Sequence, residues 1–359
     1  MNRRSTTKIV AAVLLAVLLL SACYNPSTVM SVDGSQIRCG TYLFNQIGEA
    51  ENAVNKLITA TGSNVTLQDS LDKEIEGVSF SDYVRDKTID ACKRYVFTEN
   101  AFSEYGLSIP NGVVYYYDTY CQNQWVSYSD FYLQNGISYE TFLDSTLNAY
   151  KYSLVFSYLY TDPSSPMCIS DEEMSQCYAD NYRTVSYIKL PDANNDSSAF
   201  NSEQEAKMSS LADSFVEDLD NGTPISELFN SRYDDALAIG NYTISVQDSI
   251  TQSNLTEGLL VSALTTNTDS AFLQTVLSSP VDSNGWVKGN NGVIYVYSIG
   301  NHTIEEDAWK EYKSYLAEIL RADDFDAYVK NAIASMTVEL DEKAMEYYSI
   351  SKIKTATQE

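Results

Sequence analysis

Apolar side chains recur at intervals of three and four residues through most of the first 160 positions. This spacing places them on one face of an α-helix, so it predicts helices over residues 40–57, 80–105, 113–133 and 138–160. Ahead of these helices, the dipeptide Asp33-Gly34 separates two short apolar stretches. Because that dipeptide favours two-residue turns, the stretches are predicted to form a β-hairpin.

The period changes to two at residues 184–190, where alternating side chains predict a β-strand. Near the end of the same region, a hairpin is predicted around Asn290-Asn291-Gly292. Residues 255–277 are expected to hold further helical material within polar loops. Other helices are predicted at 170–181, which opens with the capping-box pattern of Ser170 and Glu173, at 202–219 and at 225–233. This order of strand, helices and hairpin is that of a small α+β unit.

The last predicted helix follows a second capping-box pattern, Thr303 to Glu306. Its apolar stripe needs a partner, and it consists of Trp309, Tyr312, Leu316 and Ile319. Because the strand-rich unit before it is already closed, we expect this helix to dock onto the N-terminal helices. The α+β unit would then be inserted into a discontinuous helical domain.

The predicted boundaries divide the chain into seven segments. They are a signal peptide at 1–22, a lipidated tether at 23–28, the first part of the helical domain at 29–165, a connecting helix at 166–183, the inserted α+β domain at 184–302, the terminal helix at 303–336 and a tail at 337–359.

The N-terminus has the pattern of an export signal. Arg3, Arg4 and Lys8 precede an apolar run that ends near Leu20 and is shorter than the roughly 20 residues needed to span a bilayer. Small residues followed at once by Cys23 resemble a bacterial lipobox. The resemblance implies that Cys23 is acylated, becomes the first mature residue and anchors the protein on the extracytoplasmic face of the cell membrane. The alternative is a chance cysteine beside an ordinary signal peptide.

The mature chain is strongly acidic. The residues before Cys23 contain three basic and no acidic side chains, so 20 of the 23 Lys and Arg remain against 49 Asp and Glu, a net charge of −29. Nucleic acid is excluded as a partner, because its binding depends on Lys and Arg displacing counterions from phosphates. Anionic headgroups would also repel this body, so membrane attachment is expected through acyl chains.

The remaining cysteines predict neither a metal site nor a cofactor. They are five in number, widely spaced and without a C-x-x-C pair: Cys39, Cys92, Cys121, Cys168 and Cys177. We interpret them as small buried hydrophobes in a chain that does not rely on disulfides, although the sequence leaves their oxidation open.

Residues 115–132 are unusually rich in aromatic side chains. One interpretation is an aromatic helical core. The other is a peptide-contacting groove, because tyrosine keeps a polar tip and suits partly wet surfaces that meet other chains. The candidate peptide-binding residues in this segment are Tyr116, Tyr120, Trp125, Tyr128 and Tyr132.

Four segments, in the right order, resemble the extracytoplasmic family of PrsA-like foldase lipoproteins and SurA-like chaperones. They are Val32-Asp-Gly-Ser-Gln-Ile37, Asn135-Gly-Ile-Ser138, the helix at 169–182 and the stretch at 222–234. The resemblance covers nearly the whole mature chain. It implies an α+β fold in which a helical chaperone domain, built from N- and C-terminal segments, carries an inserted parvulin-like domain.

Parvulins are peptidyl-prolyl isomerases, and this chain departs from their pattern at the decisive positions. Tyr187 stands where the family has its first-strand histidine, and Val293 and Tyr295 occupy the last-strand segment that would hold the second. The single histidine, His302, falls in a loop beyond that strand. The sequence therefore predicts that the usual catalytic residues are absent.

The proline-gripping methionine of the family is missing too, because no methionine lies between Met208 and Met336. Phe272 is the candidate for the aromatic position that contacts the proline ring.

The favoured function is a membrane-anchored chaperone that holds unfolded secreted polypeptides. One alternative is an active, divergent isomerase that uses Tyr187, Tyr295 and nearby acidic groups. Another is an adaptor lipoprotein with one fixed protein partner. No hydrolytic triad or phosphate-binding loop indicates another enzyme class, and the sequence leaves the clients and the oligomeric state open.

Overall fold

The computed structural model describes residues 26–263, 265–300 and 308–355. Cys23, the signal segment and His302 lie outside them. The chain has the predicted α+β fold and divides into two compact units, one formed by the residues up to Cys168 together with those from Arg321 onward, the other by Ile169–Leu320. Within the described residues, no helix combines the length and apolarity needed to cross a membrane.

The first unit is mainly helical, and the four helices predicted there are confirmed. Ser138 begins the last of them, because its hydroxyl accepts a hydrogen bond from the backbone N–H of Thr141. The helices are α2 (Cys39–Thr61), α3 (Leu67–Ser70), α4 (Phe80–Glu104), α5 (Asn111–Gln134) and α6 (Tyr139–Thr161).

Short strands complete this unit. The predicted hairpin is β1 (Thr28–Val32) and β2 (Ser35–Arg38), with Asp33 and Gly34 both at positive φ in its turn. A second hairpin joins β3 (Glu74–Ile75) to β4 (Val78–Ser79).

The segment predicted as a tail is folded. It forms β9 (Val338–Leu340), α13 (Glu342–Tyr347) and the 3₁₀ turn η2 (Ile350–Lys352). Strand β9 pairs with β1, and Ala344 and Met345 are buried in the same cluster as the first hairpin.

The terminal helix, α12 (Lys313–Ala334), is preceded by the 3₁₀ turn η1 (Ala308–Tyr312). The predicted stripe does not dock onto the N-terminal helices, because the Tyr312 ring packs against Tyr178 and Tyr182 of the second unit and Ile319 is 39% exposed.

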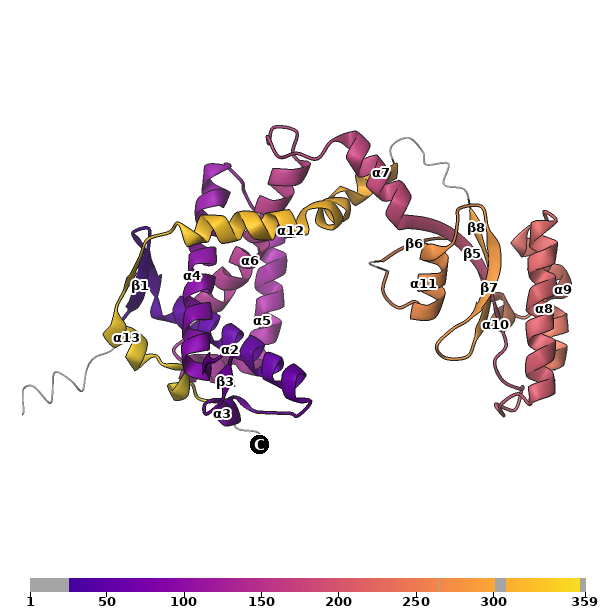
Figure 1. The fold of residues 1–359 in the computed structure, drawn as a ribbon, viewed down its shortest axis with the longest axis horizontal. Coiled ribbons are helices and arrows are strands. Elements are labelled where there is room, and N and C mark those ends of the chain that lie inside the picture. Colours follow the sequence, from indigo (N-terminus) through magenta and orange to yellow (C-terminus); the bar gives the residue numbers. More distant parts are fainter. Residues whose placement is uncertain (1–25, 264, 301–307, 356–359) are drawn as a thin grey trace, which may run out of the picture. The chain divides into compact units, whose positions relative to one another are not determined.

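The part of α12 from Arg321 onward returns to those helices. Phe325, which is 4% exposed, packs its ring against those of Tyr152, Phe156 and Tyr160 on α6. Tyr328 contacts the ring of Phe97 on α4. Figure 1 shows α12 running across these two helices.

The second unit is built on a four-stranded antiparallel sheet in the order β6-β5-β8-β7. Helices α8 and α9 pack on one face of the sheet and α11 packs on the other (Figure 1). The elements are α7 (Asp171–Asn181), β5 (Tyr182–Leu190), α8 (Ser202–Asp220), α9 (Ile225–Ile239), α10 (Ser249–Gln252), β6 (Leu255–Ser262), α11 (Ser270–Ser278), β7 (Asn284–Lys288) and β8 (Ile294–Gly300).

Strand β6 was not predicted, because helical material was expected at 255–277. The segment pairs with β5 along the edge of the sheet and contains Gly258 at a φ of 64°, opposite an irregularity in register between Val185 and Tyr187. This bulge breaks the alternation of apolar and polar side chains that marks a regular strand. The helical part of the expectation is confirmed only for α11.

Of the five cysteines of the described residues, Cys92, Cys121 and Cys177 are buried. Burial raises the pKa of the Cys92 thiol to about 12, which keeps it protonated and unreactive. The three buried cysteines agree with the interpretation as small buried hydrophobes, whereas Cys39 and Cys168 are only half-buried.

Replacing Phe325 with alanine should lower the free energy of unfolding by about 3 kcal/mol, because the cavity would open among three aromatic rings of α6. Urea denaturation followed by circular dichroism measures the change. Lys330→Ala, an exposed position on the same helix, is the control and should change stability by less than about 0.5 kcal/mol. Equal stabilities of the two variants would show that α12 does not hold this unit together.

Candidate functional site

Helix α5 is the most exposed long helix of the first unit and the most aromatic. Of its 24 residues, all within the described part of the chain, only Cys121 is buried. Tyr116 is 63% exposed, Tyr120 46% and Tyr128 54%. Exposed rings on this scale mark surfaces that meet another molecule, since a closed core would have covered them.

One side of α5 is held by α6. Tyr117 packs on Tyr150, and Trp125 contacts Phe142, with ring centroids 5.1 and 5.8 Å apart. These contacts cover a narrow stripe around Cys121. At the C-terminal end of α5, Phe131 and Tyr132 also pack against the core cluster that includes α2, and the Tyr132 and Phe44 ring centroids are 6.2 Å apart.

Three of the exposed tyrosines form a row. Tyr116, Tyr120 and Tyr128 are separated by four and eight residues, so with Gln124 they follow the i, i+4 ridge of the helix. Twelve residues at a rise of 1.5 Å make this row about 18 Å long. An extended peptide of five or six residues has that length.

The N-terminal half of this row borders a shallow hollow of about 420 Å³. The wall from α5 is aromatic, and small or hydroxyl-bearing side chains of α6 form much of the other wall. The hollow is lined by Tyr116, Tyr117, Tyr120, Thr146, Ala149, Tyr150 and Ser153.

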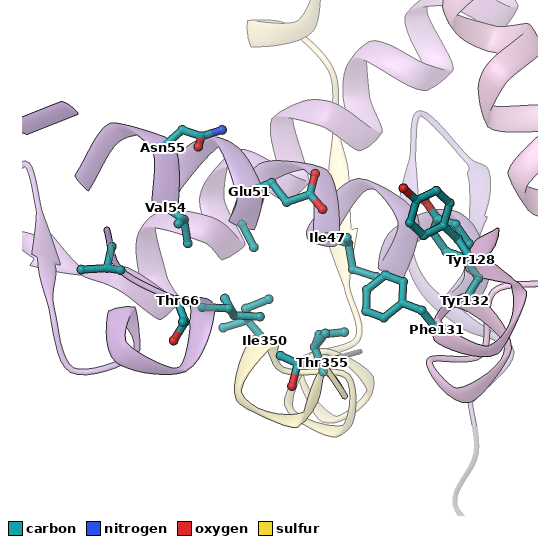
Figure 2. A pocket seen from close by; sticks show the side chains of 14 residues that line it. Ile47, Glu51, Val54, Asn55, Thr66, Tyr128, Phe131, Tyr132, Ile350 and Thr355 are labelled. Carbon is teal, nitrogen blue, oxygen red and sulfur yellow. The ribbon is translucent and has the colours of Figure 1, made fainter. Parts of the chain in front are cut away.

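The C-terminal half borders a larger depression of about 660 Å³, which we call the α2–α5 groove. Figure 2 shows Tyr128, Phe131 and Tyr132 at one end and Val54 and Thr66 towards the other. Its lining comes from α2, α5, the chain around α3 and the C-terminal segment: Ile47, Ala50, Glu51, Val54, Asn55, Val65, Thr66, Leu67, Tyr128, Phe131, Tyr132, Ile350, Ile353 and Thr355.

Local contacts fix the walls of the groove. Trp125 stacks on Tyr132 with centroids 5.8 Å apart and planes 5° apart, which supports that ring from behind. The Asn135 side chain donates a hydrogen bond to the carbonyl of Lys354 and accepts one from its N–H, at 2.9 and 2.8 Å. This pair holds the C-terminal wall against the end of α5.

Among the described residues that line the groove, Glu51 is the only charged one. The residue is exposed, but the surrounding protein removes part of the water from its carboxylate and so raises its pKa above the ordinary value. Burial also raises the pKa of the Tyr132 hydroxyl, and the nearby Glu51 charge adds to that effect. The groove is therefore an apolar surface with one carboxylate.

The structure brings most of the predicted peptide-binding residues to these two depressions. Tyr116 and Tyr120 line the hollow, and Tyr128 and Tyr132 line the groove. Trp125 is half-buried and supports Tyr132 without lining either depression.

No sequence pattern predicted the other walls of the groove. Ile350 and Ile353 belong to the segment interpreted as a tail, and their three-residue spacing was the one signal available. Glu51 and Val54 lie on α2, which was predicted as a helix at 40–57. The sequence did not indicate which element would form the facing wall of the groove.

In the second unit, the residues that the sequence resemblance matched to parvulin site positions lie together on the α11 face of the sheet. The Phe272 ring stacks on Tyr295 at 4.6 Å and meets the ring of Tyr187 at 4.9 Å, while Tyr187 and Tyr295 are 5.7 Å apart. Val293 is half-buried just before β8 and packs against the same cluster.

Phe272 does not fit the prediction of a peptide contact. Its side chain is 0% exposed and forms the centre of a hydrophobic cluster, so its place in this structure is in the core. The physical reason is that β6, the unpredicted strand, widens the sheet and gives α11 a closed surface to cover.

Asp269 fixes this cluster. One carboxylate oxygen accepts hydrogen bonds from the N–H groups of Ala271 and Phe272, and the other accepts one from the N–H of Asn290 at 2.9 Å. The turn approaches so closely that a side chain at Gly289 would overlap Asp269 and Tyr295. Burial, followed by the Asp269 charge, raises the pKa of Tyr295. The Tyr295 phenol therefore stays protonated at neutral pH, within a cluster of stacked rings.

Comparison with known proteins found no matching family model and no matching curated protein. Solved structures do match. Foldase protein PrsA from Streptococcus pneumoniae is 13% identical, with 80% of this chain and 95% of that chain covered and a TM-score of 0.32. PrsA from Lactococcus lactis is 11% identical, with 91% and 99% covered and a TM-score of 0.36.

A third match comes from work on PEB4 and Cj1289, two SurA-like chaperones of Campylobacter jejuni. It is 13% identical, with 88% of this chain and 98% of that chain covered and a TM-score of 0.26. The chain thus resembles PrsA-like and SurA-like proteins, as its sequence motifs predicted. At such identities a likeness concerns the fold, and a function needs support from the chain's own residues.

Proposed function

We propose that this protein is a membrane-anchored extracytoplasmic chaperone that holds unfolded polypeptides on α5 and in the α2–α5 groove. The observation that carries the proposal is the row of exposed tyrosines that runs from the hollow to the groove. Unfolded chains expose apolar side chains, and folded proteins rarely leave so many aromatic rings uncovered on one helix.

The size of the surface suits weak and reversible binding. Burying one large apolar side chain contributes about 1.5–3 kcal/mol, and the groove has room for a few such groups. Tyrosine hydroxyls along the row can also donate hydrogen bonds to peptide carbonyls. A surface of this kind accepts many sequences, as a chaperone requires.

The two units have different proposed roles. We propose that the unit formed by the N- and C-terminal segments is a SurA/PrsA-like chaperone domain and that the α+β unit between them is an inserted parvulin-like domain. The return of α12 onto α4 and α6 supports this arrangement.

The anchor would hold the client surface close to the membrane. The carbonyl of Pro26 already accepts a hydrogen bond from the Tyr348 hydroxyl at 2.8 Å, so folded structure begins three residues after Cys23. Three residues span about 10 Å at most. The C-terminal segment that contains Tyr348 also supplies Ile350 and Ile353 to the groove.

We also propose that the parvulin-like domain does not catalyse prolyl isomerisation. Rotation about the X–Pro bond has a barrier of about 18–20 kcal/mol, and an isomerase lowers it in a pocket shaped for the twisted amide. In this chain Phe272 and Tyr295 stack at 4.6 Å, so their rings occupy the space at the corresponding positions.

Removing the exposed rings should weaken holding. The triple variant Tyr116→Ser, Tyr120→Ser, Tyr128→Ser should need about tenfold more protein to suppress aggregation of an unfolded client, since three interface tyrosines together contribute at least about 1.4 kcal/mol. Light scattering of a diluted, denatured client measures the effect.

The matched control replaces exposed apolar residues elsewhere, Val281→Ser with Tyr315→Ser, and should act like the original chain. Equal loss in both variants would contradict a specific role for α5. Suppression limited to one client protein would favour the adaptor alternative.

The protein should leave the cis–trans exchange rate of a short proline-containing peptide unchanged at equimolar concentration. A peptide substrate separates catalysis from holding, which could slow the refolding of a larger client. Acceleration that disappears in Tyr187→Phe or Tyr295→Phe would establish the divergent isomerase instead.

Cys23→Ser should abolish incorporation of labelled fatty acid and move the protein from the membrane fraction to the soluble fraction. Cys39→Ser, a half-buried cysteine of the folded unit, is the control and should remain lipidated. Retention of the label in Cys23→Ser would refute the anchor.

A further inference from the structure

The lining of the α2–α5 groove is mostly apolar but contains one charged side chain. Glu51 is its single charged residue, and in the described part of the chain no ion pair or hydrogen bond engages its carboxylate. Lys56, the nearest lysine along α2, pairs instead with Glu76. Figure 2 shows Glu51 on the α2 wall, between Val54 and Ile47.

A carboxylate placed among apolar groups carries a desolvation cost that a cation can offset. The raised pKa of Glu51 reflects this cost. An acidic client side chain would increase it by repulsion, whereas a lysine or arginine would form an ion pair where the groove partly excludes water.

The other walls suit the same kind of segment. Lysine and arginine have apolar stems that can lie on Ile47 and Val54 while the charged head reaches Glu51. The faces of Tyr128 and Tyr132 can also attract a cation. The remaining aliphatic lining would bury a neighbouring large apolar side chain, and the net charge of the chain, −26, draws basic segments from a distance.

Building on the proposed chaperone function, we infer that the groove recognises a client segment in which a lysine or arginine neighbours a large apolar side chain, with Glu51 as the ion-pair partner. The inference makes Glu51 a specificity-determining residue. Acidic segments, even apolar ones, are then poor occupants of this groove.

The test uses a set of short Gly/Ser peptides that differ in three central positions, titrated calorimetrically into the mature chain. The central residues are Leu-Phe-Arg, Leu-Phe-Gln, Leu-Phe-Glu and Ser-Ser-Arg. Leu-Phe-Arg should bind about fivefold more tightly than Leu-Phe-Gln, the size expected of a partly exposed ion pair. Leu-Phe-Glu and Ser-Ser-Arg should bind more weakly than both.

Two variants decide whether Glu51 is responsible. Glu51→Gln should bind Leu-Phe-Arg and Leu-Phe-Gln equally while keeping its affinity for Leu-Phe-Gln. Asp130→Asn removes the same charge from an exposed position of α5 that does not line the groove, and should keep the fivefold ratio. Circular dichroism confirms that both variants are folded.

Equal binding of the Arg and Gln peptides by the original chain would overturn the inference, as would a ratio that survives in Glu51→Gln. In either case the chaperone proposal stands as long as the protein still suppresses client aggregation. Failure to suppress aggregation, with no peptide bound, would remove both.

Discussion

The return of the C-terminal segment onto the N-terminal helices is the contact on which the rest of the first unit depends. Phe325 fills a site between rings of α6, and β9 adds a strand to β1. The Asn135–Lys354 hydrogen bonds then place the last described residues beside α5. Without this return the groove would lack its Ile350 wall and the cores beneath it would be open.

That closure also explains how α5 can remain exposed. Helices α2, α4, α6 and α12 and the C-terminal segment bury one another, so the unit is stable without the outer surface of α5. A helix held along the stripe around Cys121 and at Phe131 and Tyr132 can present its other tyrosines to solvent without unfolding the rest. Under the proposed function, stability and binding then depend on different faces of the same helices.

Much of the fold could be predicted, because the apolar spacing and capping patterns that specify helices lie within short stretches of sequence. Five apolar residues at helical spacing in α8 are all buried: Met208, Leu211, Ala212, Phe215 and Leu219. Ser170 begins α7 by accepting a hydrogen bond from the N–H of Glu173. Strand β6 was missed because its bulge and Gly258 disrupt the alternation by which a strand is recognised.

The site was harder to predict than the fold. The aromatic content of α5 was compatible with a helical core or a peptide-contacting groove. Which rings stay exposed depends on how much of α5 the neighbouring helices cover. Phe272 was predicted to contact peptide because it was matched to a family motif. The elements that pack around it could not be identified from the sequence. The groove combines α2, α5 and residues near 350. Contacts between segments so far apart in sequence produce no pattern within any one segment.

In the second unit, large aromatic side chains pack together on the α11 face of the sheet. Its sheet still brings Tyr187, Phe272 and Tyr295 together, and Asp269 and Gly289 fix the elements that carry them. Large rings at these positions contact one another, which favours stability and, under the proposed function, leaves no space for a bound proline. Client recognition would then fall to the helical unit, where exposed rings lie near Glu51, whose carboxylate has no ion pair or hydrogen bond among the described residues. An acidic surface suits the proposed task, because like charges keep copies of the protein apart while apolar, basic client segments would be attracted.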